Sequence, residues 1–261
     1  MSRVSTQLPS TTLTSIGTVV YDVGAVARNP GIKYWPLIFI HAWRVFKSTT
    51  PLAIWLCFFI GAALVIQTTN SLAMMGVDRG LAGVGVGALG LRELSISVVI
   101  LAMAATAGAG FVTELGSMRV ADEIDALDVM GIHSHAYLVS TRLMGTFIAA
   151  VPLIIFCVAF TFIGGWVSAW SQRATMSMGS FAEFFWLSVA SIDFLYVAIK
   201  GAVIASMIAV ICVSHGYRAS GGPVGVGLAV GRALDLSIVG GILLNLALTY
   251  VFWGTKETLQ L

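Results

Sequence analysis

Long apolar segments separated by short polar stretches dominate the pattern of hydrophobic and polar positions along the chain. A helix needs about 20 consecutive, mostly apolar residues to cross the hydrocarbon core of a membrane. Five segments are long and apolar enough, and they cover residues 51–75, 81–113, 143–170, 184–214 and 234–253. The pattern therefore predicts an all-α polytopic membrane protein with five transmembrane helices.

Local features of three predicted spans bear on their shape. The first span is expected to begin at Pro51, because proline suits the first turn of a helix and Thr50 before it is a suitable N-cap. The second segment is long enough to be tilted, broken or preceded by a short re-entrant piece. In the third span, Pro152 predicts a kink.

Residues 32–46, just before the first span, mix apolar side chains with tryptophan and basic residues. The segment is too short to cross a membrane. Trp35, Trp43 and Arg44, with Lys47 just after it, give it the composition of a helix that lies in the membrane interface. The chain is thus expected to form a single domain over 1–261. Residues 1–50 would be a cytoplasmic segment with an interfacial helix, and residues 51–253 the transmembrane bundle.

The composition excludes a water-soluble fold. Hydrophobic residues make up 58% of the chain, charged residues 10%, and the mean hydropathy is +0.94, whereas a soluble domain has about 25% charged residues. The three cysteines are far apart, each in an apolar run. They are expected to be small buried side chains, with no disulfide and no metal site.

The distribution of basic residues predicts the orientation. In membrane proteins, lysine and arginine are in excess on the cytoplasmic side. With the N-terminus inside, that side receives nine basic residues: Arg3, Arg28, Lys33, Arg44, Lys47, Arg119, Arg142, Arg218 and Arg232. The other side receives four, namely Arg79, Arg92, Arg173 and Lys256. We therefore expect a cytoplasmic N-terminus and an external C-terminus.

The stretch 111–132, called the connector below, is a short charged segment between the second and third spans. It holds five of the twelve acidic residues: Glu114, Asp122, Glu123, Asp125 and Asp128. Ile124, Leu127 and Met130 recur every three residues, which predicts a short helix with one apolar stripe, and Gly131 offers a C-cap. Such a helix either covers the cytoplasmic end of the bundle or docks a partner subunit.

Four charged residues fall inside or at the edge of the predicted spans: Arg92, Glu93, Asp193 and Lys200. Charges at membrane depth are costly and generally face a bundle interior or a wet cavity. Arg92 and Glu93 either line a substrate cavity or lie at the outer interface, or the charges only pair with one another. For Lys200 and Asp193 the pattern favours a structural role, in which a cation neutralises a buried acid.

No motif for covalent chemistry is found in the sequence. The chain has no Gly-x-x-x-x-Gly-Lys-Ser/Thr phosphate loop, no His-Glu-x-x-His zinc motif and no Gly-x-Ser-x-Gly nucleophile. We therefore expect neither an enzyme nor a metal site. Gly85-Val86-Gly87-Ala88-Leu89-Gly90 matches a dinucleotide motif by letter, but close helix packing explains it better, with Gly83 and Gly87 four residues apart. Gly227 and Gly231 repeat that spacing before the fifth span.

Two blocks in the connector resemble the signature of the MlaE/YrbE permeases, the membrane subunits of MCE-associated ABC transporters of lipids. They are Glu114-Leu115-Gly116-Ser117-Met118-Arg119-Val120 and Glu123-Ile124-Asp125-Ala126-Leu127-Asp128-Val129-Met130-Gly131. Leu91-Arg92-Glu93-Leu94 resembles the second span of that family, and Gly225-Val226-Gly227 its last cytoplasmic loop. The resemblance covers most of the chain and is weakest before residue 35.

The resemblance implies a permease dimer in the bacterial inner membrane. The second permease chain would be identical or a sister YrbE chain. Two cytoplasmic ATPase subunits would bind ATP and Mg²⁺, this chain holding no cofactor, and MCE-domain proteins would cover the outer side. The connector would be the coupling helix that docks on the ATPase, through Glu114, Arg119, Asp122, Glu123, Asp125, Leu127, Asp128 and Met130. A lipid would lie in a cavity near Arg92, Glu93, Leu64, Ile66 and Leu72.

The chain also departs from the family pattern. Ala105-Thr106-Ala107-Gly108 lacks a basic residue that many members carry at position 106, and Ala229-Val230-Gly231-Arg232 replaces a threonine-rich run. These departures fit a member that pairs with a non-identical sister chain, as in actinobacterial MCE systems. Lipid identity and transport direction stay open. An ion- or proton-coupled secondary transporter, with the four intramembrane charges as its relay, is the alternative function.

Overall fold

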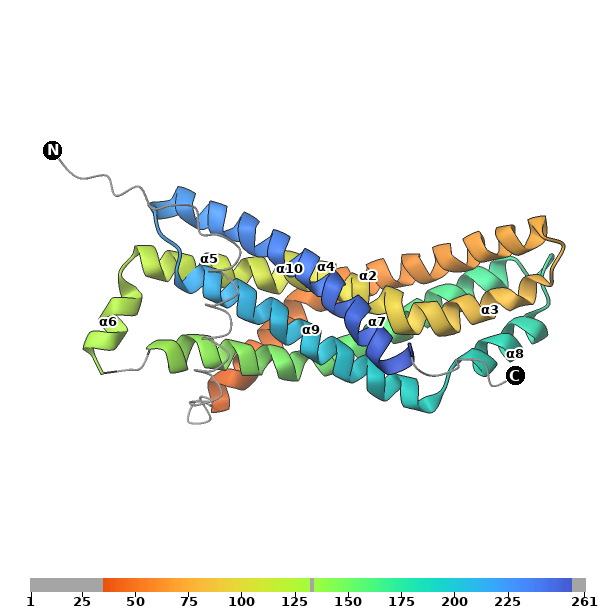
Figure 1. Ribbon diagram of the computed structural model, residues 1–261, viewed down its shortest axis with the longest axis horizontal. Coiled ribbons are helices and arrows are strands. Elements are labelled where there is room, and N and C mark those ends of the chain that lie inside the picture. The colour runs from red at the N-terminus through yellow and green to blue at the C-terminus, as the bar shows by residue number, and fades with distance from the viewer. Residues whose placement is uncertain (1–34, 132–133, 255–261) are drawn as a thin grey trace.

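The computed structural model describes residues 35–131 and 134–254, and within these ranges it contains helices and no β-strand. The helices form an elongated bundle with α6 at one end and α8 at the other (Figure 1). In chain order they are α2 (Trp35–Met74), η2 (Arg79–Leu81), α3 (Ala82–Val84), η3 (Gly85–Leu94), α4 (Ser95–Met103), η4 (Ala104–Gly108), α5 (Ala109–Val120), α6 (Glu123–Val129), η5 (His135–Ser140), α7 (Thr141–Ser171), α8 (Met178–Ser188), α9 (Ser191–Tyr217) and α10 (Gly222–Trp253).

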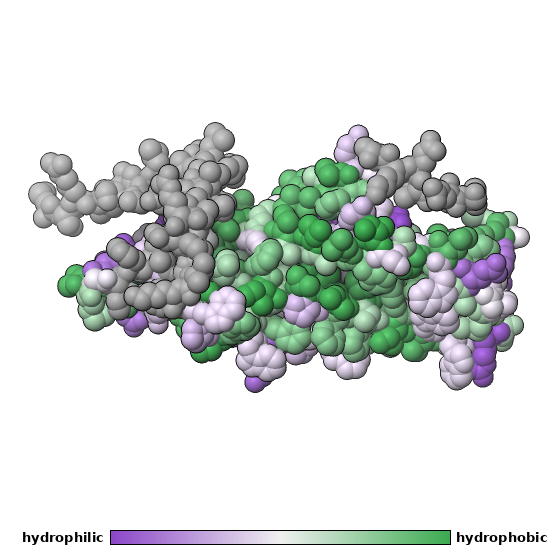
Figure 2. All heavy atoms as spheres, turned by 90° about the horizontal axis from the view of Figure 1, so that it is seen from below, coloured by the Kyte–Doolittle hydropathy of each residue, from purple (hydrophilic) through white to green (hydrophobic). Residues whose placement is uncertain are grey.

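Five helical stretches of the described chain are long and apolar enough to cross a membrane. They are Trp35–Met74, Arg79–Val120, Tyr137–Ser171, Ser191–Tyr217 and Gly222–Trp253. On the face shown in Figure 2, hydrophobic side chains dominate the middle of the long axis, and hydrophilic ones gather toward the two ends. The all-α class and the five predicted spans are confirmed.

The predicted start of the first span is wrong. α2 is a single helix of 40 residues that runs through Pro51, so Thr50 is not an N-cap, and its hydroxyl donates to the Phe46 carbonyl at 2.5 Å. Membrane helices tolerate an internal proline where neighbouring groups satisfy the backbone it frees. The described part of the predicted interfacial helix, 35–46, is therefore continuous with the first span. Residues 1–34, which carry the rest of the predicted cytoplasmic segment, and Lys256 lie outside the described residues.

α2 packs along α7 through glycines on both helices. A Cβ atom added to Gly61 would collide with the backbone of Thr161, and one added to Gly164 would collide with the backbone of Phe58. Nearer the α6 end, Gly145 lies against the backbone of α2 at Ala42. In a bilayer, helices associate by close packing of small residues, because lipid tails are as apolar as the helix surface. These glycines therefore hold α2 and α7 together as one unit.

The second span is one uninterrupted helical stretch, Arg79–Val120, that includes two π-helical segments, η3 and η4. In π geometry a backbone N–H donates to the carbonyl five residues back, as the Ser95 N–H does to Gly90. The Ser95 hydroxyl donates to the same carbonyl at 2.7 Å. The predicted packing role of Gly83 and Gly87 is confirmed, since a Cβ atom at either position would collide with α8. Gly227 and Gly231, in contrast, contact nothing within 4 Å of an added Cβ.

The predicted fourth span starts in the wrong place. Residues 184–188 belong to α8, the backbone is extended at Val189 and Ala190, and α9 begins at Ser191. Asp193 explains the new start, because its carboxylate accepts a hydrogen bond from the Ala190 N–H at 3.4 Å and a negative charge is favourable in a first helical turn.

The third span agrees with the prediction, and the fifth is longer than predicted. α7 covers Thr141–Ser171, close to the predicted 143–170, whereas α10 begins at Gly222, well before the predicted residue 234. Pro223 in the first turn of α10 suits a helix start. Cys57, Cys157 and Cys212 are buried and free, as predicted.

Candidate functional site

Arg92 and Asp193 form an ion pair that joins the second and fourth spans. Arg92 Nη2 lies 2.8 Å from Asp193 Oδ2, and Nε lies 3.3 Å from the same oxygen. The other carboxylate oxygen accepts the Trp253 indole N–H at 2.8 Å. Since the Asp193 side chain is only 3% exposed, these bonds compensate the cost of burying its charge.

A second ion pair, between Glu93 and Lys200, lies beside the first. Lys200 Nζ is 3.1 Å from Glu93 Oε1 and donates to the Arg92 carbonyl at 2.9 Å. Asn245 donates to Glu93 Oε2 at 2.7 Å, and the Thr249 hydroxyl contacts both Glu93 and Lys200. Lys200 is fully buried, whereas the Glu93 side chain is 29% exposed. Of this pair, only Glu93 is accessible from outside the bundle.

Helix periodicity explains how three spans supply this set of residues, called the intramembrane cluster below. Asp193 and Lys200 are seven residues apart and therefore lie on one face of α9. The α10 members repeat every four residues, which places them on one face as well: Asn245, Thr249 and Trp253. The Trp253 ring lies under both cations, with its centroid 5.4 Å from Arg92 Cζ and 5.6 Å from Lys200 Nζ.

The intramembrane cluster is electrically balanced, with two cations and two carboxylates in direct contact. Breaking a buried ion pair costs about 3–5 kcal/mol, because the remaining charge has no partner. The ion pairs therefore hold η3, α9 and α10 rigidly together. The intramembrane cluster offers one partly open carboxylate, on Glu93, to a ligand. Whether Arg92 and Glu93 bind substrate, and whether Lys200 and Asp193 act only structurally, stay predictions.

The apolar residues predicted to line a cavity lie in two environments. Leu64 and Leu72 are partly buried and pack against a small apolar core that includes Val65 and Phe181. Ile66 points outward and is 48% exposed. Their predicted role in binding stays untested.

The connector contains a short helix, α6, linked to α5 by a tight turn. Asp122 adopts a left-handed conformation (φ 56°) in that turn, and Gly131 after α6 has φ 76°. Of the predicted apolar stripe, Ile124 is fully buried and Leu127 is partly buried, while Met130 is 66% exposed. α6 therefore has one apolar edge on the bundle and a free outer face.

The charged residues of the connector divide into inward and outward sets. Glu114 lies in α5 and pairs with Arg44 of α2 at 3.2 Å and with Arg142 of α7 at 3.0 Å. Arg119 pairs with Asp125 at 2.5 Å, and Asp128 accepts a hydrogen bond from the Ser134 N–H. The carboxylates on and beside α6 are exposed, and so is Val129, at 89%. A surface that mixes carboxylates with exposed apolar side chains suits contact with a protein.

Sequence reasoning missed two sets of residues that complete these sites. The α10 partners Asn245, Thr249 and Trp253 sit in an apolar segment, and their spacing of four residues is the one signal that could have revealed them. Glu114 lies 70 positions from Arg44 in the sequence and is also far from Arg142. No local pattern predicts that these side chains meet. No group of three or more His, Cys, Asp or Glu in the described ranges could hold a metal ion.

Comparison with known protein families gives a match to the family described as "Permease MlaE" over residues 38–251. The matched region includes the connector, nearly all of the five spans and every member of the intramembrane cluster except Trp253. The resemblance that the connector motif predicted is thereby confirmed.

Several curated proteins are similar over most of this chain. Protein TRIGALACTOSYLDIACYLGLYCEROL 1 from the chloroplast of Arabidopsis thaliana is 29% identical over 221 residues, which cover 82% of this chain but only 62% of the plant protein. A probable ABC transporter permease protein from Rickettsia bellii is 27% identical, covering 88% of each chain. A probable ABC transporter permease protein from Synechocystis is 28% identical, covering 77% of this chain and 76% of its own length.

Proposed function

This chain belongs to the MlaE permease family, and on that premise we propose that it moves lipids as the membrane subunit of an ABC transporter driven by separate ATPase subunits. The family and the names of its relatives establish a transport permease and not an enzyme. The lipid cargo, the ATPase contact, the paired permease and the MCE-domain proteins are the parts we propose.

The observation that carries the proposal is α6, which presents exposed carboxylates and apolar side chains at one end of the bundle (Figure 1). The chain has no phosphate-binding loop of its own, so the energy of ATP must arrive through contact with another subunit. α6 is the element at this end best suited to that contact, because its outer face is free while Ile124 anchors its inner face.

One uninterrupted span connects the turn before α6 to the intramembrane cluster. The second span runs without interruption from Arg79 to Val120, so a displacement of α6 acts on the helix that carries Arg92 and Glu93. Glu114 transmits the same displacement to α2 and α7 through Arg44 and Arg142. We propose that ATP-driven movement of α6 rearranges the first, second and fifth spans around a lipid near Glu93. ATP and Mg²⁺ bind to the partner ATPase.

Two observations support a lipid as the cargo. The name of the plant relative is that of a galactolipid, trigalactosyldiacylglycerol. In addition, large apolar side chains such as Ile66, Leu89 and Leu101 stay exposed on the spans, and apolar surface at membrane depth accepts acyl chains without desolvating polar groups. The lipid head group would lie near the exposed edge of Glu93.

The proposed orientation places α6 in the cytoplasm and α8 on the outer side of a bacterial inner membrane, where MCE-domain proteins would bind. The described basic residues support it. Arg44, Arg119 and Arg142 gather at the α6 end, as the excess of cytoplasmic positive charge requires.

Charge reversal on α6 tests the docking proposal. We expect the double variant Asp125→Lys and Asp128→Lys to lose most of the ATPase subunit that co-purifies with the wild-type chain from native membranes. Val129→Asp, at a side chain with no internal role to disturb, is expected to act in the same direction. Glu183→Lys, an exposed reversal on α8 at the opposite end, is the matched control. Normal ATPase recovery and turnover with both α6 variants would refute docking through α6.

The balanced charges of the intramembrane cluster favour one second candidate, an ion- or proton-coupled secondary transporter. That function needs no ATPase. The same purification separates the two, because a secondary transporter would come from its native membrane with no ATP-binding subunit and would transport in vesicles without ATP.

A further inference from the structure

Four polar side chains from three helices meet near the α6 end of the bundle, and we call them the basic cluster. Glu114 of α5 pairs there with Arg44 of α2 and Arg142 of α7. His41 lies three residues before Arg44 on α2. Its Cβ lies 2.9 Å from the position of a Cβ added to Gly145, which is three residues after Arg142 on α7. Residues three apart are neighbours on a helix surface, so His41 lies beside both arginines.

The basic cluster carries more positive than negative charge. Both guanidinium groups contact the same oxygen, Glu114 Oε1, at 3.2 Å and 3.0 Å. Among the ion pairs of the described residues, Glu114 is the only acid that pairs with either arginine. One positive charge is therefore left without a counter-charge, in contrast to the balanced intramembrane cluster, and an anion would neutralise it.

Two buried nitrogen atoms of the basic cluster, His41 Nδ1 and Arg142 Nε, have no hydrogen-bond partner among the described residues. His41 is 5% exposed and the Arg142 side chain is 3% exposed. Arginine Nε always carries a hydrogen, and histidine Nδ1 carries one in one neutral tautomer and in the charged form. A buried donor that makes no hydrogen bond is costly. The group that completes these two atoms is therefore a hydrogen-bond acceptor.

A phosphate group is an anion with several acceptor oxygens, so it meets both demands. Arginine binds phosphate well, because the flat fork of N–H groups matches its oxygens. Arg44 is the exposed member of the basic cluster, at 56%, and only its Nη1 bonds to Glu114. Its other N–H groups can contact a phosphate from outside. Exposed ion pairs rearrange easily, so Arg44 can also move aside to open a path to the buried donors.

The surroundings of the basic cluster identify the source of the phosphate as a lipid. The first turns of α2 lie toward the α6 end (Figure 1), and they carry exposed aromatic and basic side chains. Trp35 and Trp43 are 52% and 64% exposed, and Lys47 is exposed as well. Tryptophan and basic residues gather where lipid head groups meet water. Arg44 therefore lies at the level of the lipid phosphates.

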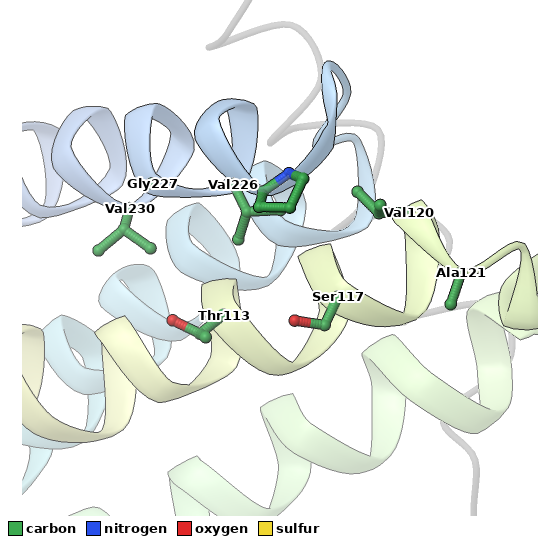
Figure 3. A pocket seen from close by; sticks show the side chains of 8 residues that line it. Thr113, Ser117, Val120, Ala121, Val226, Gly227 and Val230 are labelled. Atoms are coloured by element: carbon green, nitrogen blue, oxygen red, sulfur yellow. The ribbon is translucent and has the colours of Figure 1, made fainter.

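The nearby groove between α5 and α10 is less suited to a phosphate. It has a volume of about 500 Å³, and none of the described residues that line it is charged. Figure 3 shows Thr113 and Ser117 on the α5 side of the groove and Val226 and Val230 on the α10 side. The Thr113 hydroxyl already donates to the Ala109 carbonyl at 2.9 Å. The groove suits apolar groups, which leaves the basic cluster as the place for the phosphate.

We propose that the basic cluster binds the phosphate of a membrane lipid in the leaflet at the α6 end. Arg44 is the exposed contact, and His41 and Arg142 are the buried donors. A lipid bound there joins α2 to α7 beside α5, the helix that leads to α6. This site is separate from the proposed cargo site near Glu93, and it depends on neither the cargo nor the ATPase.

Thermal unfolding of the full-length chain in an uncharged detergent tests the proposal. Three probes are compared at equal concentration: dioctanoyl phosphatidylglycerol, dioctanoylglycerol, which lacks the phosphate, and inorganic phosphate. We expect the phospholipid to raise Tm by about 3 °C or more, because a ligand of the folded state stabilises it. The other two probes should shift Tm by less than about 1 °C at that concentration.

Two variants locate the site. Arg44→Gln and His41→Leu should each lower the phospholipid-induced shift at least ~2-fold, because each removes one donor to the phosphate. His41→Leu should not lower the Tm of the lipid-free protein, since it replaces an atom that makes no hydrogen bond. Arg173→Gln is the matched control, because Arg173 is an exposed arginine beside Trp170 outside the basic cluster. It should leave the shift unchanged.

Three results would overturn the proposal. An equal shift with dioctanoylglycerol would show that the acyl chains bind and the phosphate does not. A full shift with inorganic phosphate at the same concentration would assign the site to a free anion instead of a lipid. A phospholipid shift that both Arg44→Gln and His41→Leu leave intact would place the phosphate elsewhere. Each of these results leaves the proposed function standing, since co-purification of the ATPase tests that separately.

Discussion

The intramembrane cluster and the connector both contain charged residues from several helices, but the charges are buried in the first and exposed in the second. In the intramembrane cluster, Asp193 and Lys200 are buried, and each has its partners within the chain. In the connector, the Arg119–Asp125 pair is 39% and 60% exposed, and neighbouring carboxylates face outward. The intramembrane cluster is closed to other proteins, while the connector is open to them.

This difference indicates which region can change its contacts during a transport cycle and which region keeps its structure. Exposed ion pairs contribute little to stability and rearrange easily, so the connector suits a contact that changes during a cycle. Buried pairs resist separation because each lost partner leaves an uncompensated charge. A cycle that moves the second span must therefore rearrange the intramembrane cluster as a unit.

Breaking the intramembrane cluster should have the largest effect on stability. We expect Lys200→Met to destabilise the protein by about 3 kcal/mol, toward the lower end of the range for a broken buried pair because Glu93 is 29% exposed. Chemical denaturation in detergent measures the change. The double variant Lys200→Met with Glu93→Gln removes both charges and should recover most of the loss. Equal destabilisation in the single and double variants would contradict an ion-pair origin.

The sequence predicted the elements whose signals are local. Five spans follow from hydrophobic length, and α6 follows from a short charged segment between two of them. Arg92, Glu93, Asp193 and Lys200 stood out because charges are rare in such segments. Their α10 partners Asn245, Thr249 and Trp253 did not, since a contact between helices far apart in sequence leaves only the spacing of four residues as a signal.

The errors arose where tertiary contacts override local preference. Pro51 is a good helix start by propensity, yet packing against α7 carries α2 through it. The break at Val189 and Ala190 lies inside an apolar run, so hydropathy alone could not place it, and Asp193 marks it only once its role in the first turn is known. Hydrophobic length locates spans well and their ends poorly.

An intermediate effect is expected at Glu114, which combines features of both regions. Its side chain is 40% exposed, but its partner Arg142 is only 3% exposed and also donates to the Leu138 carbonyl. Glu114→Gln should cost about 1–2 kcal/mol in the same denaturation experiment, because a buried guanidinium loses its carboxylate. Arg44→Gln removes the partner that is 56% exposed and should cost about 0.5 kcal/mol or less. Equal costs for the two variants would show that burial of Arg142 is not the cause.

The smallest effect on stability is expected for a substitution of Arg119. This substitution should instead make α6 more mobile. Arg119→Ala removes an ion pair with both partners exposed, so global stability should change by less than about 1 kcal/mol. α6 is short and joined to α5 by the turn at Asp122, so the pair is one of few contacts that fix its angle. Hydrogen exchange of amides 123–129 should become faster in the variant.

In the wild type, salt at about 1 M should produce the same increase, since screening weakens exposed pairs. Unchanged exchange under both conditions would mean that the burial of Ile124 and Leu127 holds α6 without the ion pair, and that the connector is more rigid than its exposed charges suggest.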